Sequence, residues 1–486
     1  MLLSAEMLLY FQRCHRRTFL DTYGDLTQKD PLSDFHLRLQ QERFAHQQAV
    51  LQAQIEQGAT LHQKPVYPSQ DWQAGAEATQ EMMRQGVERI YRGVLTAEVD
   101  SDGKLVTLVS APDLLVKQPG KSYFGDWVYV PIDIHLGKRP KLEYQIVAAY
   151  HAYLLSFVQG ISSEKAWLIL RGKGWYLVNL ERSLPQMQEA LQASLAMLVH
   201  GREPEVFISR QICNLCPWFS SCYQIAKSQE HLSLIPGVSP TRYQSLQKLG
   251  LNTAEAIANS DPAQLALEIG LDTAQQLVNQ AKSLTNNCAI PRQPHFPANY
   301  LPNSPIEIYF DIEAEPDLNL DYLLGVLVVN QEEETQTFHP FFAEKPTDEG
   351  SIWEQFIDLV SSYPKAPIFH FSPYEAETVK RLAKLYQTPK GQTRALLARF
   401  VDLHKRLHSA VTLPVESYSL KSIARWMGFH WRYPQANGSL CICWYNNWLE
   451  TGSSSWLDLI VAYNEDDCLA TYQIKEWLAG FLQETM

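Results

Sequence analysis

Three cysteines stand close together in QICNLCPWFSSC, residues 211–222. Cys213, Cys216 and Cys222 form the spacing C-x2-C-x5-C. Cysteine thiolates are soft metal ligands, and a centre with four thiolates requires one more. Cys14, in YFQRCHRRTFL, is the candidate for the fourth ligand. If all four bind one centre, the chain between them is closed into one domain.

Carboxylates form a second candidate site between these cysteines. Asp113 follows Pro112, and Asp133 begins the sequence D-I-H that ends at His135. Two carboxylates near the ends of adjacent strands can share one Mg²⁺, and a third side chain beside them can contact water or a phosphate. For Asp113 alone, a turn or strand-end role is the alternative.

Another set of acids lies near the C-terminus. In IEIYFDIEAEPD, Asp311 and Glu313 are two residues apart on an apolar strand and therefore share a face. In VAYNEDDCLATYQ, Tyr463 and Asp467 are four residues apart on a predicted helix and also share a face. Carboxylates gathered in this way can bind a divalent metal.

The elements that must position the first two sets follow from hydrophobic periodicity. Residues 1–60 are expected to be helical, ending near Gly58. Strands are expected in GVERIYRGVLTAEVD, GKLVTLVSAPDLLVKQ and DWVYVPIDIHLGK. A helix in YQIVAAYHAYLLSFVQG, a ribbon in KAWLILRGKGWYLVNL and a helix in SLPQMQEALQASLAMLVHG follow. Together they predict one α/β unit.

The C-terminal acids require a second α/β unit at residues 306–486. Strands are expected in LLGVLVVN, TQTFHPFFA and PIFHFS, and helices in SIWEQFIDLVSSY and YEAETVKRLAKLY. RFVDLHKRL predicts a strand that enters a helix at Asp402, and SYSLKSIARWMGF predicts a helix after a polar cap. Asp466 is read as a solvated neighbour of Asp467.

The length and composition of the chain limit the number of domains and the classes of protein to which it can belong. A chain of 486 residues with 45% hydrophobic residues predicts two to four soluble domains. No apolar run is long enough to cross a membrane and the N-terminus lacks the pattern of a signal peptide, so we expect a cytoplasmic protein. Eight cysteines are too few for a disulfide scaffold in a chain of this size.

The charge is unevenly distributed along the chain. The whole sequence has 41 basic and 53 acidic residues, a net charge of -12. Residues 306–486 hold 14 basic and 25 acidic side chains, so this segment alone carries -11. The acidity therefore does not exclude a polyanionic partner, because surplus carboxylates can form a metal site that accepts phosphate once loaded.

The N-terminal pattern resembles the RecB-type nucleases of the PD-(D/E)xK superfamily, in the branch that carries an iron–sulfur cluster. The resemblance covers residues 1 to about 226 and implies a restriction-endonuclease-like α/β domain, with predicted bounds of residues 1–229. It implies a 4Fe-4S cluster on the four cysteines, with Zn²⁺ or unliganded thiols as alternatives. The matching residues are S-x5-Y-x3-C-x2-R-x-F ending at Phe19, His46, Pro112-Asp113, Asp133, Gln145, Cys213, Cys216 and Cys222.

By this resemblance, His46, Asp113 and Asp133 are metal ligands and Gln145 helps to hold the catalytic group. The sequence departs from the family at His135, where the family has lysine. Lysine is a fixed positive charge, whereas histidine is mostly neutral at neutral pH. The first domain is therefore either catalytic or a weakened nucleic-acid-binding fold.

Residues 230–285 predict a small all-α module with similar openings, LSLIPGVSPTRYQSLQKLGL and LALEIGLDTAQQLVNQAKSL. Tight turns at Gly237 and Gly270 resemble helix-hairpin-helix motifs, which bind the DNA backbone without reading bases. A spacer of packed helices is the alternative, since Asp272 would repel a phosphate. Residues 286–305 contain five prolines and predict a linker.

The last segment resembles the tyrosine-bearing DEDD exonucleases of the RNase H-like fold, in particular the YprB-type domain. The resemblance implies that Asp311, Glu313 and Asp467 hold divalent metals and that Tyr463 orients the attacking water. Glu375 stands where the family has its third Asp. Asp402 is then either an accessory acid or a structural N-cap.

Together these patterns predict an α/β multidomain nuclease that acts with Mg or Mn on nucleic acid, DNA rather than RNA. Activity is expected in the C-terminal domain and also considered for the first. A separate helicase is a candidate partner, because the chain has no Walker A motif of its own. The alternative is a weakened nucleic-acid-binding or recruitment protein whose iron–sulfur cluster has a structural or redox-sensing role.

Overall fold

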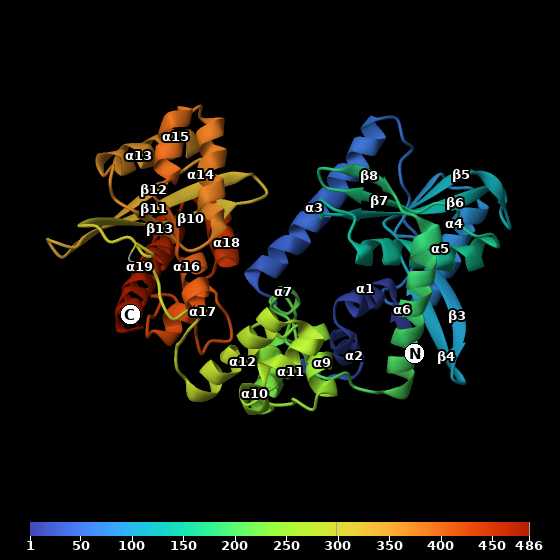
Figure 1. The fold of residues 1–486 in the computed structure, drawn as a ribbon. Helices are drawn as coiled ribbons and strands as arrows, with labels where there is room; N and C mark the ends of the chain where they lie inside the picture. The colour runs from blue at the N-terminus through green and yellow to red at the C-terminus, as the bar shows by residue number, and fades with distance from the viewer. Residues whose placement is uncertain (298, 486) are drawn as a thin grey trace. The chain divides into compact units, whose positions relative to one another are not determined.

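The computed structural model describes residues 1–297 and 299–485. The chain divides into the compact units Met1–Ala226 and Lys227–Met486, which are described separately below (Figure 1). Residue 298, inside the predicted linker, and residue 486, at the end of the predicted last domain, lie outside the described residues.

The first unit is an α/β fold. One of its sheets has the strand order β2-β5-β6-β7-β8, and another has the order β1-β4-β3. Strand β6 pairs antiparallel with β5 and parallel with β7, so a crossover connects β6 to β7. The strands are β1 (Leu2–Ser4), β2 (Arg89–Tyr91), β3 (Leu95–Ser101), β4 (Lys104–Ser110), β5 (Leu114–Ser122), β6 (Gly125–His135), β7 (Trp167–Leu170) and β8 (Gly174–Leu177).

The crossover is helix α5, which packs against β6 on one side and α6 on the other. Helix α5 is apolar because most of its surface is buried, and it ends at Gly160 in the left-handed conformation. The helices of this unit are α1 (Ala5–Arg13), α2 (His15–Tyr23), α3 (Asp34–Glu56), α4 (Trp72–Arg84), α5 (Leu142–Gln159), α6 (Leu180–His200), α7 (Arg210–Cys213) and α8 (Phe219–Ser228), with the 3-10 turn η1 (Leu26–Gln28).

The N-terminal region differs in detail from the helical stretch predicted for residues 1–60. Leu2–Ser4 forms a strand that pairs parallel with β4, and Ser4 then caps α1. Cys14 lies between α1 and α2 in an extended conformation, which breaks the predicted helix there. Helix α3 ends close to Gly58 as predicted, whereas no helix was predicted at α4.

The second unit begins with a helical part. Its core contains Leu246, Ile257, Leu265 and Val278. Gly237 and Gly270 both have positive φ, the backbone geometry that glycine adopts most readily. The elements are η2 (Leu232–Leu234), α9 (Pro240–Lys248), α10 (Ala254–Ala258), α11 (Pro262–Ile269) and α12 (Leu271–Asn286).

The proline-rich segment differs from the predicted linker. Ile290–Pro291 forms strand β9, which pairs with β15 (Val411–Thr412), and Phe296 is buried in the core of the last domain. Pro291 is tolerated because this ladder is short and has free edges. Residues around β9 are therefore packed against the domain that follows.

The last domain contains a mixed sheet with the order β12-β11-β10-β13-β14. Strand β10 lies in the centre, antiparallel to β11 and parallel to β13. Its strands are β10 (Ile306–Glu315), β11 (Leu320–Asn330), β12 (Thr335–Phe342), β13 (Ile368–His370) and β14 (Phe400–Asp402). Its helices are α13 (Glu349–Ser362), α14 (Pro373–Leu385), α15 (Lys390–Leu397), α16 (Leu403–Ala410), α17 (Leu420–Trp426), α18 (Gly438–Thr451) and α19 (Ser454–Thr485), with the 3-10 turn η3 (Pro346–Asp348).

Helices cover both faces of this sheet. Tyr309 of β10 meets Tyr472 of α19, and the next residue, Phe310, stacks on Phe356 of α13. Because successive strand residues point to opposite faces, α19 and α13 lie on opposite sides of β10. Asp311 and Glu313 point to the same face as Tyr309, which is the α19 face.

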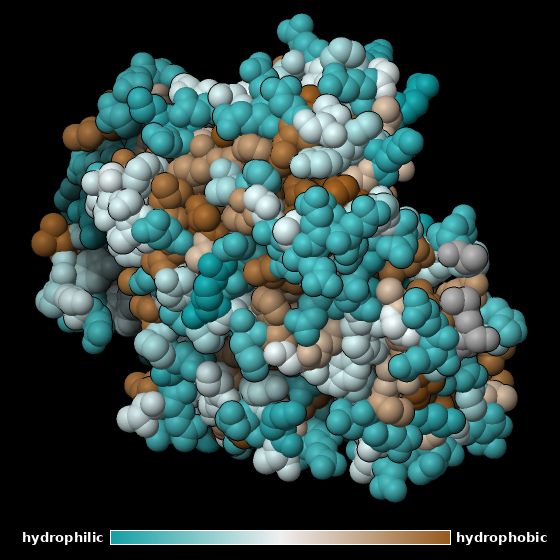
Figure 2. Space-filling model, turned by 90° about the vertical axis from the view of Figure 1, so that its left-hand side faces the viewer, coloured by the Kyte–Doolittle hydropathy of each residue, from teal (hydrophilic) through white to brown (hydrophobic). Residues whose placement is uncertain are grey.

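The surface shown in Figure 2 is a mosaic of hydrophilic residues with smaller hydrophobic patches between them. Among the residues that the structure describes, none of the helices combines the length and the apolar character that a membrane span requires.

Candidate active site

Three carboxylates meet where β10 faces α19. Asp311 and Glu313 come from β10 and Asp467 from α19, and their ligand oxygens all lie within 4.8 Å of one another. Among the described residues, this is the one group of at least three histidine, cysteine or acidic side chains that is packed so closely. Glu313 and Asp467 are 6% and 7% exposed, whereas Asp311 is only partly buried, so solvent reaches the group mainly at Asp311.

The electrostatics of the group reflect this crowding. Burial and the charges of Asp467, Glu313 and Glu375 raise the pKa of Asp311 well above its usual value. Burial and Asp467 do the same to the pKa of Glu313. Burial raises the pKa of Asp467 to about 6 even though Trp431 and Lys421 favour its ionised form. The ionised group is therefore costly unless a cation binds to it.

Donors orient two of these carboxylates. The Asn464 amide donates to Asp311 Oδ2 at 2.7 Å, and the Trp431 indole donates to Asp467 Oδ1 at 2.6 Å. The remaining carboxylate oxygens of the group are the ones available to a cation or a substrate.

Tyr463 and Lys421 lie beside the acids. Tyr463 hydrogen-bonds to Asp467, and burial together with Asp467 and Glu313 raises its pKa. Lys421 Nζ lies 4.6 Å from the centre of the Tyr463 ring and donates to the Ala436 carbonyl. Burial lowers the pKa of Lys421, while Asp467 and Glu313 oppose that shift.

Glu375 lies in the first turn of α14 and is near enough to Asp311 to raise its pKa. Ser372 Oγ donates to Glu375 Oε2 at 2.7 Å, and His370 Nδ1 lies 3.6 Å from the same oxygen. These contacts hold Glu375 at the edge of the carboxylate group, at the C-terminal end of β13.

Two neighbouring acids have other partners. Asp402 is the N-cap of α16, because its Oδ1 accepts a hydrogen bond from the Lys405 amide at 2.9 Å. Asp466 is not solvated, as the sequence suggested, but is buried and paired with Arg432 at 2.8 Å. Asp466 and Asp467 point to different sides of α19, and Asp467 is the one that joins Asp311 and Glu313.

The first unit also brings its predicted acids together. The Asp113 amide donates to Asp133 Oδ1 at 3.4 Å, since the two residues lie at the ends of paired strands β5 and β6. Gln47 donates to Asp113 Oδ1 at 2.8 Å, and His151 Nε2 lies 3.0 Å from Asp133 Oδ2. Both acids line a cavity of about 520 Å³ together with His135.

The two acids differ in their pKa. Burial and the charge of Asp133 raise the pKa of Asp113 to about 6. Burial opposes ionisation of Asp133 as well, but the charge and hydrogen bond of His151 outweigh it and lower its pKa. One carboxyl of the pair is thus suited to hold a proton that the other releases.

The other residues predicted for this site are placed differently. His135 stacks on Tyr144 with ring centres 4.0 Å apart, and burial lowers its pKa to about 4. It is therefore neutral at pH 7 and does not replace the positive charge of a lysine. Gln145 donates to the Pro140 carbonyl at 2.8 Å, and neither Gln145 nor His46 is among the described residues that line the cavity. His46 Nε2 is buried and without a hydrogen-bond partner among the described residues.

The four cysteines are neighbours but are not in close contact. The charge of Cys14 contributes to raising the pKa of Cys213, Cys216 and Cys222, after the larger effect of burial. The pKa of Cys216 rises to about 11. Among the described residues, no three of these sulfur atoms all lie within 4.8 Å of one another.

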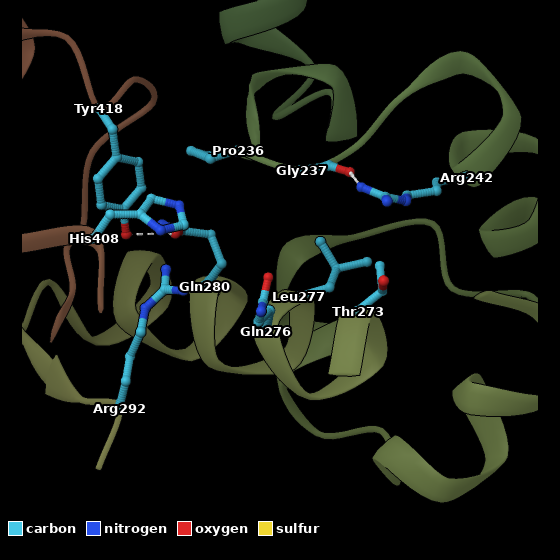
Figure 3. Close-up of a pocket in the computed structure, with 10 residues that line it drawn as sticks. All are labelled: Pro236, Gly237, Arg242, Thr273, Gln276, Leu277, Gln280, Arg292, His408 and Tyr418. Atoms are coloured by element: carbon cyan, nitrogen blue, oxygen red, sulfur yellow. Dashed lines mark hydrogen bonds between the residues drawn. The ribbon is translucent and has the colours of Figure 1, made fainter. Parts of the chain in front are cut away.

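Gly237 lines a small cavity of about 90 Å³ in the second unit (Figure 3). Its carbonyl accepts a hydrogen bond from Arg242 at 2.7 Å. Arg292 and His408, from the chain that follows the helical part, line the same cavity. Gly270 does not line it, and its amide donates to the Ala266 carbonyl at the end of α11.

Several residues of these sites were not predicted. Asn464 and Trp431 orient the C-terminal acids, Lys421 supplies a cation, and His151 pairs with Asp133. The sequence did offer a signal for Asn464, because this residue directly follows Tyr463, which was predicted to be in the site. Lys421 and Trp431 had none, since the path of the chain after β15 brings them to the site.

The comparisons with known proteins support the RNase H-like fold predicted for the C-terminal part. A protein-family model described as the RNase_H superfamily matches residues 308–479. No curated protein matches the chain. A solved structure titled "Crystal structure of SSO0001" is similar at 12% identity over 45% of this chain and 84% of its own, with a TM-score of 0.25, too low to indicate a shared fold. The chain is thus a mixed α/β multidomain protein whose C-terminal part is an RNase H-like domain, a fold generally found in nucleases that bind nucleic acid.

Proposed function

We propose that the C-terminal domain is a metal-dependent exonuclease that hydrolyses phosphodiester bonds, with DNA as its substrate. The observation that carries this proposal is the group of Asp311, Glu313 and Asp467, whose ligand oxygens lie within 4.8 Å of one another. Glu375 and Tyr463 stand beside the group, and Glu375 takes the place of the third aspartate of the tyrosine-bearing DEDD pattern.

The residues fit a divalent cation such as Mg²⁺ or Mn²⁺. Hard cations bind carboxylate oxygens, and burial together with mutual repulsion raises the pKa values of Asp311 and Glu313. Asp311, Glu313 and Asp467 would be the ligands, with Glu375 at the edge. Divalent cations bound there activate water and stabilise the leaving oxygen in phosphodiester hydrolysis.

The surrounding residues have positioning roles. Asn464 and Trp431 fix the carboxylates through the hydrogen bonds described above. Tyr463 keeps its phenolic proton because burial and the nearby acids raise its pKa. That proton is donated to Asp467 in this structure, and once a cation binds Asp467 it would turn to orient the attacking water. Lys421 offsets part of the negative charge of Glu313 and Asp467.

The experiment is a nuclease assay on the full chain with labelled single- and double-stranded DNA and RNA in Mg²⁺ or Mn²⁺. We expect Asp311→Asn to lower the rate by about a hundredfold or more, as expected for loss of a ligand to the catalytic metal. Asp458→Asn is the matched control, because Asp458 is exposed on the same helix as Asp467. If Asp311→Asn cleaves as fast as the unmodified chain, the proposal is wrong.

The first unit has a second candidate function. We propose that it is a RecB-like domain, of residues 1–229, that binds nucleic acid and is either a weak nuclease or a binder. Its support is the paired Asp113 and Asp133 in a cavity that also contains His151. The same assay with Asp113→Asn distinguishes a weak nuclease from a binder. Unchanged cleavage by this variant indicates that the first unit only binds nucleic acid. Loss of one cleavage product indicates that the first unit is catalytic.

For the cysteines we propose a 4Fe-4S cluster on Cys14, Cys213, Cys216 and Cys222. With Zn–S bonds of about 2.3 Å, a zinc ion holds four sulfur atoms about 3.8 Å apart. Among the described residues no three of these sulfur atoms all lie within 4.8 Å of one another, and in a cluster each thiolate binds a different iron. A zinc ion would require the thiolates to move together.

We also propose that residues 230–285 bind the backbone of nucleic acid through the turn at Gly237. Arg242 beside that turn and the positive φ of Gly237 support this. The turn at Gly270 is a weaker candidate, because its amide is used by α11 and Asp272 follows it. A separate helicase remains the candidate partner that would supply single strands.

A further inference from the structure

Cations are concentrated in one stretch of the acidic last domain. Residues 306–486 hold 14 basic and 25 acidic side chains. Residues 378–401 hold six of those basic side chains and none of the acidic ones. This stretch forms most of α14, all of α15 and the start of β14. An acidic domain therefore carries a local basic region on the helix that presents Glu375 and on the helix that follows it.

Part of this positive charge has a structural role. Arg381 is paired with the buried acids Asp321 and Glu349. Arg399 donates to the backbone carbonyls of Ala366 and Val360, both at 2.9 Å. These two arginines hold the helices of the domain to its sheet, so they are not available to a ligand.

The remaining cations of the stretch line one hollow, which we call the α14–α15 hollow. Its volume is about 740 Å³, and its apolar floor includes Ala383, Pro389 and Leu397. The described residues that line it include no carboxylate. The cations around it are Lys380, Lys384, Lys390 and Arg394.

These side chains are exposed and mostly unpaired. Lys380 forms an exposed ion pair with Glu377 at 2.9 Å. Within the part of the chain that the structure describes, Lys384, Lys390 and Arg394 form no ion pair, although all are exposed. Like charges gathered without partners repel one another, and an anion bound between them removes that cost.

Helix geometry relates the hollow to the carboxylate group. Glu375 lies in the first turn of α14 and Lys384 in its last turn. At about 1.5 Å per residue, Lys380 is roughly 7.5 Å and Lys384 roughly 13.5 Å along the axis from Glu375. Phosphates of one DNA strand recur about every 3.4 Å along a duplex, so these axial separations correspond to about two to four phosphates. At about 100° per residue, Lys384 projects from the opposite side of α14 to Glu375, so a strand that reaches both must pass around the helix.

We propose that the α14–α15 hollow binds backbone phosphates of the substrate strand a few nucleotides away from the scissile bond. This rests on the proposed nuclease function and adds a substrate-binding site to it. The cations contact phosphates without reading sequence, and the apolar floor accommodates a sugar or a base. A long strand is thus held more tightly than a mononucleotide that reaches only the acids.

The test compares Lys390→Glu/Arg394→Glu with Lys345→Glu/Lys365→Glu, which changes the charge equally at exposed positions outside the hollow. Two substrates are used: a labelled single-stranded 20-nucleotide DNA and the p-nitrophenyl ester of thymidine 5′-monophosphate, which is too short to reach the hollow. Binding of the DNA is measured separately by fluorescence anisotropy in Ca²⁺ as a function of salt. Circular dichroism verifies that each variant is folded.

For the hollow variant we expect KM for the DNA to rise by about tenfold or more, because two favourable contacts of about 1 kcal/mol each become repulsive. Turnover of the ester is expected to stay within about twofold, and the salt dependence of DNA binding is expected to weaken by about 0.7 per lost phosphate contact. The control variant is expected to match the unmodified chain in all three measurements.

Unchanged DNA binding by the hollow variant overturns the proposal and leaves an acidic protein as the occupant of the hollow. Equal losses on DNA and ester also overturn it, because they indicate an effect on catalysis. If the unmodified chain cleaves neither substrate, the nuclease function fails on its own. The anisotropy measurement then still decides whether the hollow binds DNA.

Discussion

At the scale of single residues, the C-terminal site brings several negative charges close together. Asp311, Glu313 and Asp467 repel one another in a buried place, and Asn464, Trp431 and Lys421 offset only part of that repulsion. Residues kept in such a costly arrangement are commonly functional, because a bound cation relieves the cost.

The repulsion predicts a pH-dependent stability of the metal-free protein. The pKa of Asp467 is about 6 in the folded protein, against a usual 3.8. The raised pKa contributes to the free energy of unfolding fully below pH 3.8, and this contribution is lost as the pH rises through 6. Asp467→Asn should therefore be more stable than the unmodified chain at pH 8, by on the order of 3 kcal/mol, and about equal at pH 4. Denaturant unfolding in EDTA at both pH values measures this, and a pH-independent difference would contradict it.

Removal of Lys421 should affect catalysis. The Lys421→Met variant loses a positive charge that favours ionised Glu313 and Asp467, so their pKa values rise further. We expect kcat to fall by roughly tenfold and the acidic limb of the pH–rate profile to move to higher pH. Lys421→Arg, which keeps the charge, serves as the control. A profile that stays in place in the methionine variant would show that Lys421 has only a structural role.

At the scale of elements, the site depends on the close approach of β11, β10 and α19. Gly325 of β11 pairs with Asp311 of β10, and α19 lies directly over both. A Cβ atom at Gly325 would overlap Asn464 Oδ1, and Asn464 is the donor to Asp311. The absence of a side chain at position 325 is thus what allows α19 to present Asn464 and Asp467.

Gly325→Ala should therefore impair both stability and activity. Overpacking at this contact is expected to cost about 1–3 kcal/mol and to displace Asn464 from Asp311. The matched control is Gly480→Ala in α19, where an added Cβ atom meets nothing within 4 Å. This substitution should stabilise the helix by about 0.5–1 kcal/mol. Thermal unfolding and the nuclease assay measure the two effects. An active, equally stable Gly325→Ala variant would contradict this role of Gly325.

Local patterns were sufficient for part of this arrangement. The strand with Asp311 and Glu313 and the helix with Tyr463 and Asp467 follow from periods of two and of four residues. The role of Lys421 depends on how distant segments pack, and the packing of Phe296 against the last domain does too. Proline content predicted a linker there because it excludes helix and central strand, but it does not exclude a short edge ladder.

At the scale of the whole molecule, different metal chemistries are assigned to different units. The soft thiols of Cys14, Cys213, Cys216 and Cys222 belong to the unit Met1–Ala226, and the hard carboxylates of the C-terminal site belong to the unit Lys227–Met486. The same division separates the charge, because the acidity of the chain is concentrated in residues 306–486. Soft and hard ligands select different metals, so we expect each proposed centre to be removable separately.

Cys14→Ser tests the cysteine centre. If the four thiolates hold an iron–sulfur cluster, anaerobically purified protein shows broad visible absorbance, and the variant loses it together with thermal stability. Cys288→Ser is the control, since Cys288 is exposed in the second unit. Colourless protein that contains zinc would identify the alternative metal, and protein without either metal would contradict a metal centre at these cysteines.

The most direct test of the central claim is a titration of metal-free protein with Mn²⁺, followed by electron paramagnetic resonance of the free ion. We expect Asp311→Asn/Asp467→Asn to lose Mn²⁺ sites that the unmodified chain has, and Asp113→Asn/Asp133→Asn to keep them. A titration curve of Asp311→Asn/Asp467→Asn that superimposes on that of the unmodified chain would show that these carboxylates do not hold the metal and that the proposed nuclease site is wrong.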